Sequence, residues 1–415
     1  MNGSRPLHLF EGIGIELEYM IVNRRSLAVL PVADQLLAAQ AGHLTDEVEA
    51  GPLRWSNELV LHVVELKTNG PAASLQGLAD AFQQGVTAIN RRLAALDGRL
   101  MPTAMHPWMD PSRDGRLWPH DNSIIYQTYH RIFDCRGHGW VNLQSCHINL
   151  PFCGDEEFGR LHAAIRLLLP ILPALAASSP FMDSRPSGFL DTRLQVYRDN
   201  QKRIPLVTGR VIPEPVFTRR TYQEGILQPL YRAIADVDPE GILQEEWLNS
   251  RGAIARFERQ TIEIRILDVQ EAPIVDLAIA AAVTGTLKAL VSQRWHPFSR
   301  QQDWPQEPLS SILSDTIRDA DRAVIDNSAY LAMFGIGRPH ATAGELWRHI
   351  ITTLASERSD DLQPAMPFLE NILTRGPLAR RILRSLGDAP SLDKLAATYA
   401  NLCQCLAEGK MYLPP

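Results

Sequence analysis

The chain has 415 residues, of which 45% are hydrophobic and 21% charged, a balance typical of a folded globular protein. This length allows a large core, organised as one elaborate domain or as two. The net charge of −6 argues against general nucleic-acid binding. The N-terminal apolar run stops at Glu11, too early for a signal peptide. We therefore expect a cytoplasmic protein.

No membrane partner is expected either. The longest apolar stretch, 273–291, is interrupted by Asp276 and Lys288, which favours a core helix over a membrane span.

Five cysteines are present, an odd number that favours reduced thiols when no secretion signal precedes them. Cys135, Cys146, Cys153 and His147 could be imagined as a zinc site. No C-x-x-C knuckle occurs, however, and isolated cysteines usually serve as small buried hydrophobes. We therefore reject a zinc site. The closely spaced Cys403 and Cys405 are interpreted as incidental.

The segment 12–22 alternates between apolar and polar residues with the period of a half-buried strand. Glu16 and Glu18 therefore project from one face, with backbone positions about 6.5–7 Å apart. A solvated strand face is the common reason for such a pattern. Two carboxylates on one rigid face also repel each other unless a cation lies between them.

Two further acidic residues follow in 57–68, a β-rich run that ends at the turn signal 69–71. Glu58 and Glu65 are seven residues apart, so one regular strand would point them to opposite faces. They can serve one site only if a bend or a bulge intervenes. After this run, Ser74 is expected to cap a helix whose apolar residues recur at spacings of three and four up to Leu93.

The stretch 101–130 is rich in Pro, Trp and His, and we predict long loops there. His106, Trp108 and Trp118 either line a substrate pocket or anchor the loop. A strand is predicted over 144–151, with His147 on its polar side. The apolar helix predicted over 156–177 is expected to be broken at its prolines.

A basic cluster follows this helix in an otherwise acidic protein. It would suit phosphate or carboxylate groups if it faced a pocket. Its members are Arg185, Arg193, Arg198, Lys202, Arg203 and Arg210.

The last predicted strand is 256–268. Its alternation buries three isoleucines and leaves Glu263 and Arg265 together on the other face, most simply as an ion pair. Helices are predicted from there onward, over 272–295, 309–334, 343–356, 361–374 and 391–407. Because neither a G-x-G-x-x-G nor a Walker loop occurs, any nucleotide is not held in a Rossmann or P-loop manner.

Three strands that each carry Glu, His or Arg on one face suit magnesium or manganese better than zinc. Here the sequence resembles the carboxylate–amine ligase branch of the glutamate–cysteine ligases, within the glutamine synthetase superfamily. Five motifs carry the resemblance in the family order: GIELE at 14–18, VELKTNGP at 64–71, CHINLP at 146–151, SSPF at 178–181 and RQTIEIRILD at 259–268.

The resemblance implies an α+β fold with a glutamine-synthetase-like curved antiparallel sheet, helices on its convex side and a mostly helical C-terminal region. It implies a single catalytic domain over 1–415, with the helical portion 300–415 packed on it. ATP would phosphorylate an acid, and an amine would attack the acyl phosphate to give an amide. The acid is expected to be glutamate or a related amino acid, and the amine perhaps that of cysteine.

The site residues follow from matching these motifs. The metal ligands for Mg²⁺, or alternatively Mn²⁺, are Glu16, Glu18, Glu58, Glu65, His147 and Glu263. Arg198, Lys202, Arg256 and Arg265 are assigned to the nucleotide. Arg198, Arg265 and Glu65 are assigned to catalysis. The expected partners are a small-molecule acid and amine, and a homodimer is a further expectation.

Two other function classes stay open at this point. One is a non-catalytic descendant that binds nucleotide or amino acid as a sensor. Retention of every acidic candidate argues against it, since a sensor would not need a full metal set. The other is a metal-dependent hydrolase that uses the same carboxylates.

Overall fold

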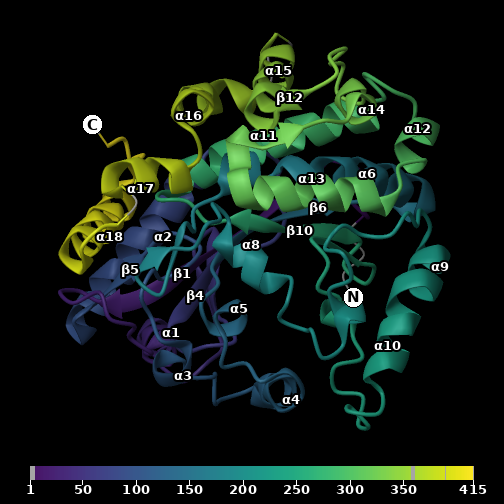
Figure 1. Ribbon diagram of the computed structural model, residues 1–415. Coiled ribbons are helices and arrows are strands. Elements are labelled where there is room, and N and C mark those ends of the chain that lie inside the picture. The colour runs from purple at the N-terminus through teal and green to yellow at the C-terminus, as the bar shows by residue number, and fades with distance from the viewer. Residues whose placement is uncertain (1–4, 357–359, 388, 415) are drawn as a thin grey trace.

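The computed structural model describes residues 5–356, 360–387 and 389–414, and its centre is an antiparallel sheet (Figure 1). In this described part of the chain, the main sheet has eight strands, in the order β2-β3-β4-β1-β6-β10-β9, with β5 paired to the outer half of β1. The strands are β1 Gly14–Asn23, β2 Glu47–Ala50, β3 Leu53–Asn57, β4 Val63–Thr68, β5 Gly98–Met101, β6 Ser145–Pro151, β9 Ala253–Arg256 and β10 Thr261–Asp268.

Helices and two small two-stranded sheets complete the described fold. The short strands are β7 Phe181–Met182, β8 Arg185–Pro186, β11 Val324–Ile325 and β12 Ala341–Thr342. The helices up to residue 234 are α1 Ala33–Ala41, α2 Leu78–Leu93, α3 Pro111–Asp114, α4 Ser123–Phe133, α5 His138–Val141, α6 Gly154–Leu168, α7 Pro173–Ala176, α8 Thr192–Tyr197, α9 Arg219–Tyr222 and α10 Gln228–Ile234. The later ones are α11 Pro273–Val291, α12 Phe298–Gln302, α13 Gln306–Asp319, α14 Ser328–Ala332, α15 Ala343–Ala355, α16 Leu362–Arg375, α17 Leu378–Leu386 and α18 Leu392–Glu408.

The two faces of the sheet differ because apolar and polar residues alternate along its central strands. Ile15, Leu17, Ile148 and Ile264 are fully buried in the main hydrophobic core. Helices α2, α6, α11, α13, α15 and α16 contribute to that core, and α15 and α16 pack on α11 (Figure 1). The predicted class, α+β with an antiparallel sheet, is confirmed. The opposite face of the sheet carries the polar side chains of the same strands, and it is the face on which a functional site can form.

Helix α11 is the apolar stretch for which a core position was predicted. It is long and apolar enough to cross a membrane, yet 78% of its most apolar window is buried inside the protein. It contacts α2, α6, α15 and α16. The prediction of a core helix is therefore confirmed.

The helices after residue 300 pack back onto the first part of the chain. Helix α16 contacts α11, and α18 contacts β5 and α2. Helix α17, which the sequence pattern did not reveal, contributes Leu378 and Ile382 to a second apolar cluster beneath β1 and β5. Tyr412, beyond the last helix, shares Glu271 as a hydrogen-bond acceptor with Arg381. These contacts fix the C-terminal region against the sheet.

Five sequence predictions need correction. The helix predicted over 309–334 is divided into α13 and α14, with β11 between them. The run 57–68 is not one strand, because β3 ends at Asn57 and the chain reverses before β4 begins. The run 256–268 is a hairpin of β9 and β10, closed by a tight turn. Helix α2 starts after Gly77 and Ser74 does not cap it. The stretch 101–130 includes α3 and part of α4 rather than only loops.

Candidate functional site

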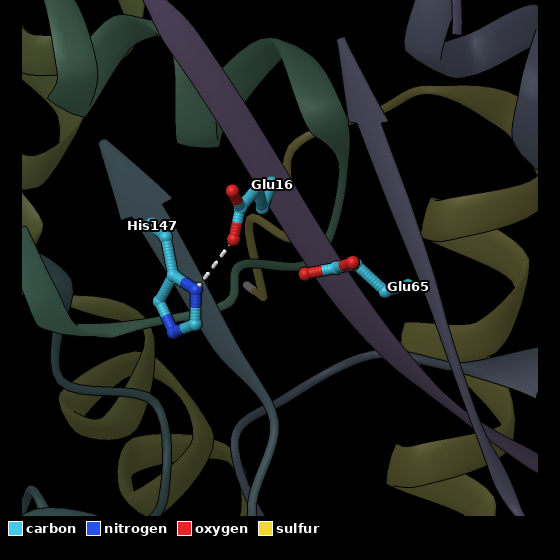
Figure 2. Close-up of side chains that lie close together, drawn as sticks. All are labelled: Glu16, Glu65 and His147. Atoms are coloured by element: carbon cyan, nitrogen blue, oxygen red, sulfur yellow. Dashed lines mark hydrogen bonds and ion pairs between the residues drawn. The ribbon is translucent and has the colours of Figure 1, made fainter. Parts of the chain in front are cut away.

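The strand register brings the acidic candidates together on the polar face of the sheet. On β1, Glu16 lies opposite His147 of β6 and Lys67 of β4, and Glu18 lies opposite Glu65 of β4. Figure 2 shows Glu65 reaching from its own strand toward Glu16, with His147 on the other side. Three neighbouring strands thus supply one cluster.

Two overlapping triads of ligand-bearing side chains result. Glu16, Glu65 and His147 form one, and Glu18, Glu58 and Glu65 form the other. Within each triad the ligand atoms all lie within 4.8 Å of one another. Glu58 reaches the cluster because the chain bends just after β3, which meets the condition that its odd spacing from Glu65 imposed. Glu65 belongs to both triads.

Hydrogen bonds fix the side of the cluster next to β6. His147 Nδ1 lies 2.9 Å from Glu16 Oε2, and its Nε2 lies 2.9 Å from Ser145 Oγ. Ser145 donates twice to Glu18 Oε2, from its backbone N–H at 2.7 Å and from its hydroxyl at 2.9 Å. Asn149 Nδ2 donates to Glu16 Oε1 at 2.9 Å. These bonds hold the first-strand carboxylates in one orientation.

The other side of the cluster carries crowded negative charge. Burial, followed by the charges of Glu18 and Glu65, raises the pKa of Glu58 well above its usual value. Burial, followed by the charge of Glu16, raises the pKa of Glu65 to about 7. A divalent cation bound between these carboxylates would offset their mutual repulsion.

His147 offsets part of that charge. Burial would lower its pKa, but the hydrogen bond to Glu16 and the charge of Glu18 outweigh burial and raise the pKa to about 9. Burial would likewise raise the pKa of Glu16, but the hydrogen bond from His147 and its charge lower it to about 2. In the metal-free cleft, both ring nitrogens of His147 donate protons.

Strands β9 and β10 form a second, basic wall. Glu263 Oε1 lies 3.5 Å from Arg265 Nε and 3.9 Å from His147 Nδ1, and Glu263 Oε2 lies 3.6 Å from Arg256 Nη1. A bulge places Arg265 and Ile266 together opposite His147. Such a bulge turns a side chain away from the regular alternation. The predicted pair of Glu263 and Arg265 is present, as part of a larger group of cations.

These two walls border one cavity of about 920 Å³. Its acidic side carries Glu16, Glu58 and Glu65, and its basic side carries Arg256 and Arg265. Four further basic residues line it: Arg5, Arg54 on β3, Lys67 on β4 and Arg259 in the β9–β10 turn. The cavity can therefore take a ligand that combines cations with a polyanion.

Other predicted residues lie elsewhere. Arg198 and Lys202 line a second pocket of about 570 Å³, beside α13, rather than the carboxylate cavity. Arg193 is buried and bonds to Asp268 instead of facing a pocket. The basic cluster that the sequence predicted after residue 177 therefore does not face one pocket as a whole.

The loop tryptophans are anchors, not site residues. Trp118 is buried and its Nε1 donates to the carbonyl of Asp121. His106 bonds to the carbonyl of Leu27, and Trp108 packs edge-on against Tyr399.

Sequence reasoning missed Lys67, Ser145 and Asn149 as functional candidates. The signal for the last two was their parity with His147, which places them on the same face. For Lys67 the signal was its position two residues after Glu65 on the same strand.

The donor set fits magnesium or manganese. It consists of carboxylate oxygens and one imidazole, without a thiolate, which suits hard divalent cations. Glu58 and Glu65 lie close together where the triads meet, and their mutual repulsion contributes to the raised pKa of Glu58, so a cation there would stabilise both carboxylates.

Comparison with known proteins identifies relatives that cover most of this chain. A family described as glutamate–cysteine ligase family 2 matches residues 12–398. An "Uncharacterized protein" of Archaeoglobus fulgidus is 30% identical over 405 residues, covering 97% of this chain and 100% of the relative. A "Putative glutamate--cysteine ligase 2-1" of a Nocardioides species is 26% identical over 303 residues, covering 72% of each chain.

A solved structure shares the fold. The crystal structure of glutamate–cysteine ligase from Francisella tularensis in complex with AMP superimposes with a TM-score of 0.64 at 12% identity. The match covers 97% of this chain and 90% of that one. Since the family match spans nearly the whole sequence, this chain belongs to glutamate–cysteine ligase family 2, a family of ATP-dependent ligases.

Proposed function

We propose that this protein is an ATP-dependent carboxylate–amine ligase that activates an acid as an acyl phosphate. The observation that carries the proposal is the pair of triads sharing Glu65, opposite the basic wall of Arg256 and Arg265 in one cavity. A sheet curved around this cavity, as in the glutamine synthetase superfamily, is part of the proposal.

The acidic side would hold two divalent cations, one in each triad. Magnesium or manganese bound there supplies positive charge that stabilises the phosphates of ATP and the transferring phosphoryl group. Glu65, with one carboxylate in both triads, would bridge the two positions. Ser145 and Asn149 orient Glu18 and Glu16 for this task.

The basic wall would hold the phosphate chain. Arg256 and Arg265 flank Glu263, which keeps their guanidinium groups together at the cavity. Arginine suits this role because its planar donors match phosphate oxygens. Arg198 and Lys202 line a different pocket and are not part of this proposal.

The proposed chemistry has two steps. A substrate carboxylate oxygen attacks the γ-phosphorus of ATP and the bond to ADP breaks, which gives an acyl phosphate. The amine then attacks the acyl carbon, phosphate leaves, and the amine loses a proton as the amide forms. The cations and arginines offset charge in both steps. We propose glutamate or a related amino acid as the acid.

Phosphate release from ATP tests this function. A ligase releases phosphate only when an acid and an amine are both present. A sensor releases none under any condition, and a metal-dependent hydrolase acts on its substrate without ATP. Mass spectrometry of products from paired acids and amines, beginning with glutamate and cysteine, identifies the substrates. Turnover of ATP that ignores the amine would overturn the proposal.

A further inference from the structure

Lys67 is a cation inside the acidic side of the cavity that the proposed function leaves without a role. It lies on β4 directly opposite Glu16. Its Nζ is 3.1 Å from Glu65 Oε2 and 2.8 Å from Glu47 Oε2. Its side chain lines the cavity and is 26% exposed. It is therefore in direct contact with the carboxylate shared by both triads.

A neighbouring ion pair keeps Lys67 at this position. Glu47, on the edge strand β2, accepts from Arg54 Nη1 through its other oxygen at 2.8 Å. Arg54 also pairs with Glu49 at 3.2 Å. Glu65 Oε2 has a second donor of its own, the hydroxyl of Ser56 at 2.6 Å. Glu65 therefore stays oriented by Ser56 even if Lys67 leaves it.

The flexible stem of lysine allows such a departure. Its ammonium group is a point charge on four methylenes and can exchange partners without moving the backbone. Part of the Lys67 side chain faces the open cavity, so a phosphate there is within its reach. The strand positions place Lys67 on the β4 side, whereas Arg256 and Arg265 approach from β9 and β10.

We propose that Lys67 binds the phosphate chain of the nucleotide directly, leaving Glu65 when the phosphates enter. This inference rests on the proposed function. In the empty cavity Lys67 and Glu65 neutralise each other. In the filled cavity Lys67 neutralises phosphate and Glu65 faces a divalent cation. The exchange gives the Lys67 ammonium group an anionic partner in both states, and it puts cations on both sides of the phosphate chain.

The test is binding of ADP to the full-length protein and to Lys67→Met, with Mg²⁺ and with EDTA. Calorimetry suits the Mg²⁺ series and saturation-transfer NMR suits the weaker EDTA series. We expect the substitution to weaken ADP binding at least tenfold in both series, because the contact is with phosphate. Adenosine, which has no phosphate, should bind both proteins equally.

Two variants control the experiment. Lys410→Met makes the same change at an exposed lysine paired with Glu408 and should bind ADP like the unmodified protein. Lys67→Arg retains a cation and should recover most of the affinity. A thermal melt of each variant confirms that it is folded. If Lys67→Met does not fold, the comparison of Lys67→Arg with the unmodified protein still tests the inference.

The outcomes separate this inference from the proposed function. If the unmodified protein does not bind ADP at all, the proposed function fails. If it binds ADP and Lys67→Met binds equally well, only the Lys67 inference fails. A loss seen with Mg²⁺ but absent in EDTA also overturns it, since Lys67 would then act only through Glu65.

Discussion

Two clusters of buried charge lie side by side in this protein and are built in opposite ways. One is centred on Asp268 at the end of β10, and the other on the glutamates of the cavity. Ser145 lies between them, because it pairs with Asp268 across the strands and donates to Glu18. The two clusters share a sheet and differ in how their charges are compensated.

Asp268 is matched by donors. Its carboxylate accepts from Arg193 Nε at 2.5 Å, and from the Ser178 N–H and the Ser179 hydroxyl at 2.8 Å each. Both members of the ion pair are almost completely buried. A buried pair with this many hydrogen bonds holds elements together, here the SSPF segment and α8 against β10.

The cavity glutamates are matched less evenly, and Glu58 is the clearest case. Among the described residues, none donates a hydrogen bond to the Glu58 carboxylate, and its pKa is raised well above normal by burial and by Glu18 and Glu65. The difference indicates that charge paired within the chain supports the fold, whereas carboxylates crowded at a cavity suit a cationic ligand. The crowded carboxylates that suit the cavity for a cation lower the stability of the folded protein.

The largest expected effect comes from Glu65→Gln. It keeps the shape of the side chain and removes the one carboxylate that both triads share. We expect ligase turnover to fall by about 10²–10³-fold or more, since comparable losses follow removal of a single group that stabilises transition-state charge. Chelation of divalent ions should abolish turnover, and added Mg²⁺ or Mn²⁺ should restore it. Steady-state release of phosphate measures both.

The matched control is Glu49→Gln, on edge strand β2 of the same sheet, where the side chain pairs with Arg54 at the surface. It should retain normal turnover. If Glu65→Gln kept more than a tenth of the activity, the shared-ligand assignment would be wrong.

Asp268→Asn should have the largest effect on stability. Removing one charge of this buried pair leaves Arg193 with only the neighbouring Asp191 to offset its charge, and we expect a cost of up to about 3–5 kcal/mol. Equilibrium unfolding in urea measures this loss. Asp315→Asn, at an exposed pair with Arg318, should leave the unfolding midpoint unchanged. Equal effects of the two substitutions would contradict the structural role of Asp268.

The same contrast explains what the sequence could predict. Alternation along β1, β6 and β10 correctly placed Glu16, Glu18, His147 and Glu263 on polar faces, because side-chain direction in a strand is a local property. The motif resemblance added Glu58 and Glu65. The chain reversal after Asn57 and the β9–β10 hairpin were missed, because β-rich runs looked continuous without a strong turn signal.

Contacts between residues that are far apart in the chain could not be predicted from the sequence. Neither the contact of Lys67 with Glu65 nor the burial of Arg193 on Asp268 follows from local patterns, since both depend on which strands and helices become neighbours. For that reason Arg193 and Arg198 looked alike in the sequence, although one is a structural partner and the other lines a second pocket.

Glu58→Gln should stabilise the metal-free protein. Because the folded-state pKa of Glu58 is raised, its ionised form opposes folding at pH values above its unfolded pKa of about 4.5. At pH 8 we expect a gain of about 0.5–2 kcal/mol, the usual size for such changes. The gain should vanish below about pH 3.5, where both states hold the proton. Lower stability of Glu58→Gln than of the unmodified protein at pH 8 would argue against unbalanced charge.

Excess Mg²⁺ should make the unmodified protein more stable than Glu58→Gln. A cation that binds the folded state stabilises the unmodified protein, which has the complete triad, more than Glu58→Gln. Thermal melts with and without Mg²⁺ at pH 8 measure the difference.

The smallest effect concerns His62, a buried imidazole that has no carboxylate partner of the kind that His147 has. Burial lowers its pKa to about 4 despite its hydrogen bond to the Val141 carbonyl. The unfolded chain therefore binds a proton at about pH 6.5 that the folded chain refuses until about pH 4. Stability from this group is complete above pH 6.5 and is lost as the pH falls through that window, by about 1 kcal/mol between pH 6.5 and 5.5. Imidazole chemical shifts in the metal-free protein should show His62 neutral at pH 5.5 while His147, beside Glu16 and Glu18, is still protonated at pH 8. If both rings titrated near pH 6.5, neighbouring carboxylates would not be what sets their charge, and the contrast between balanced and unbalanced clusters would lose its electrostatic basis.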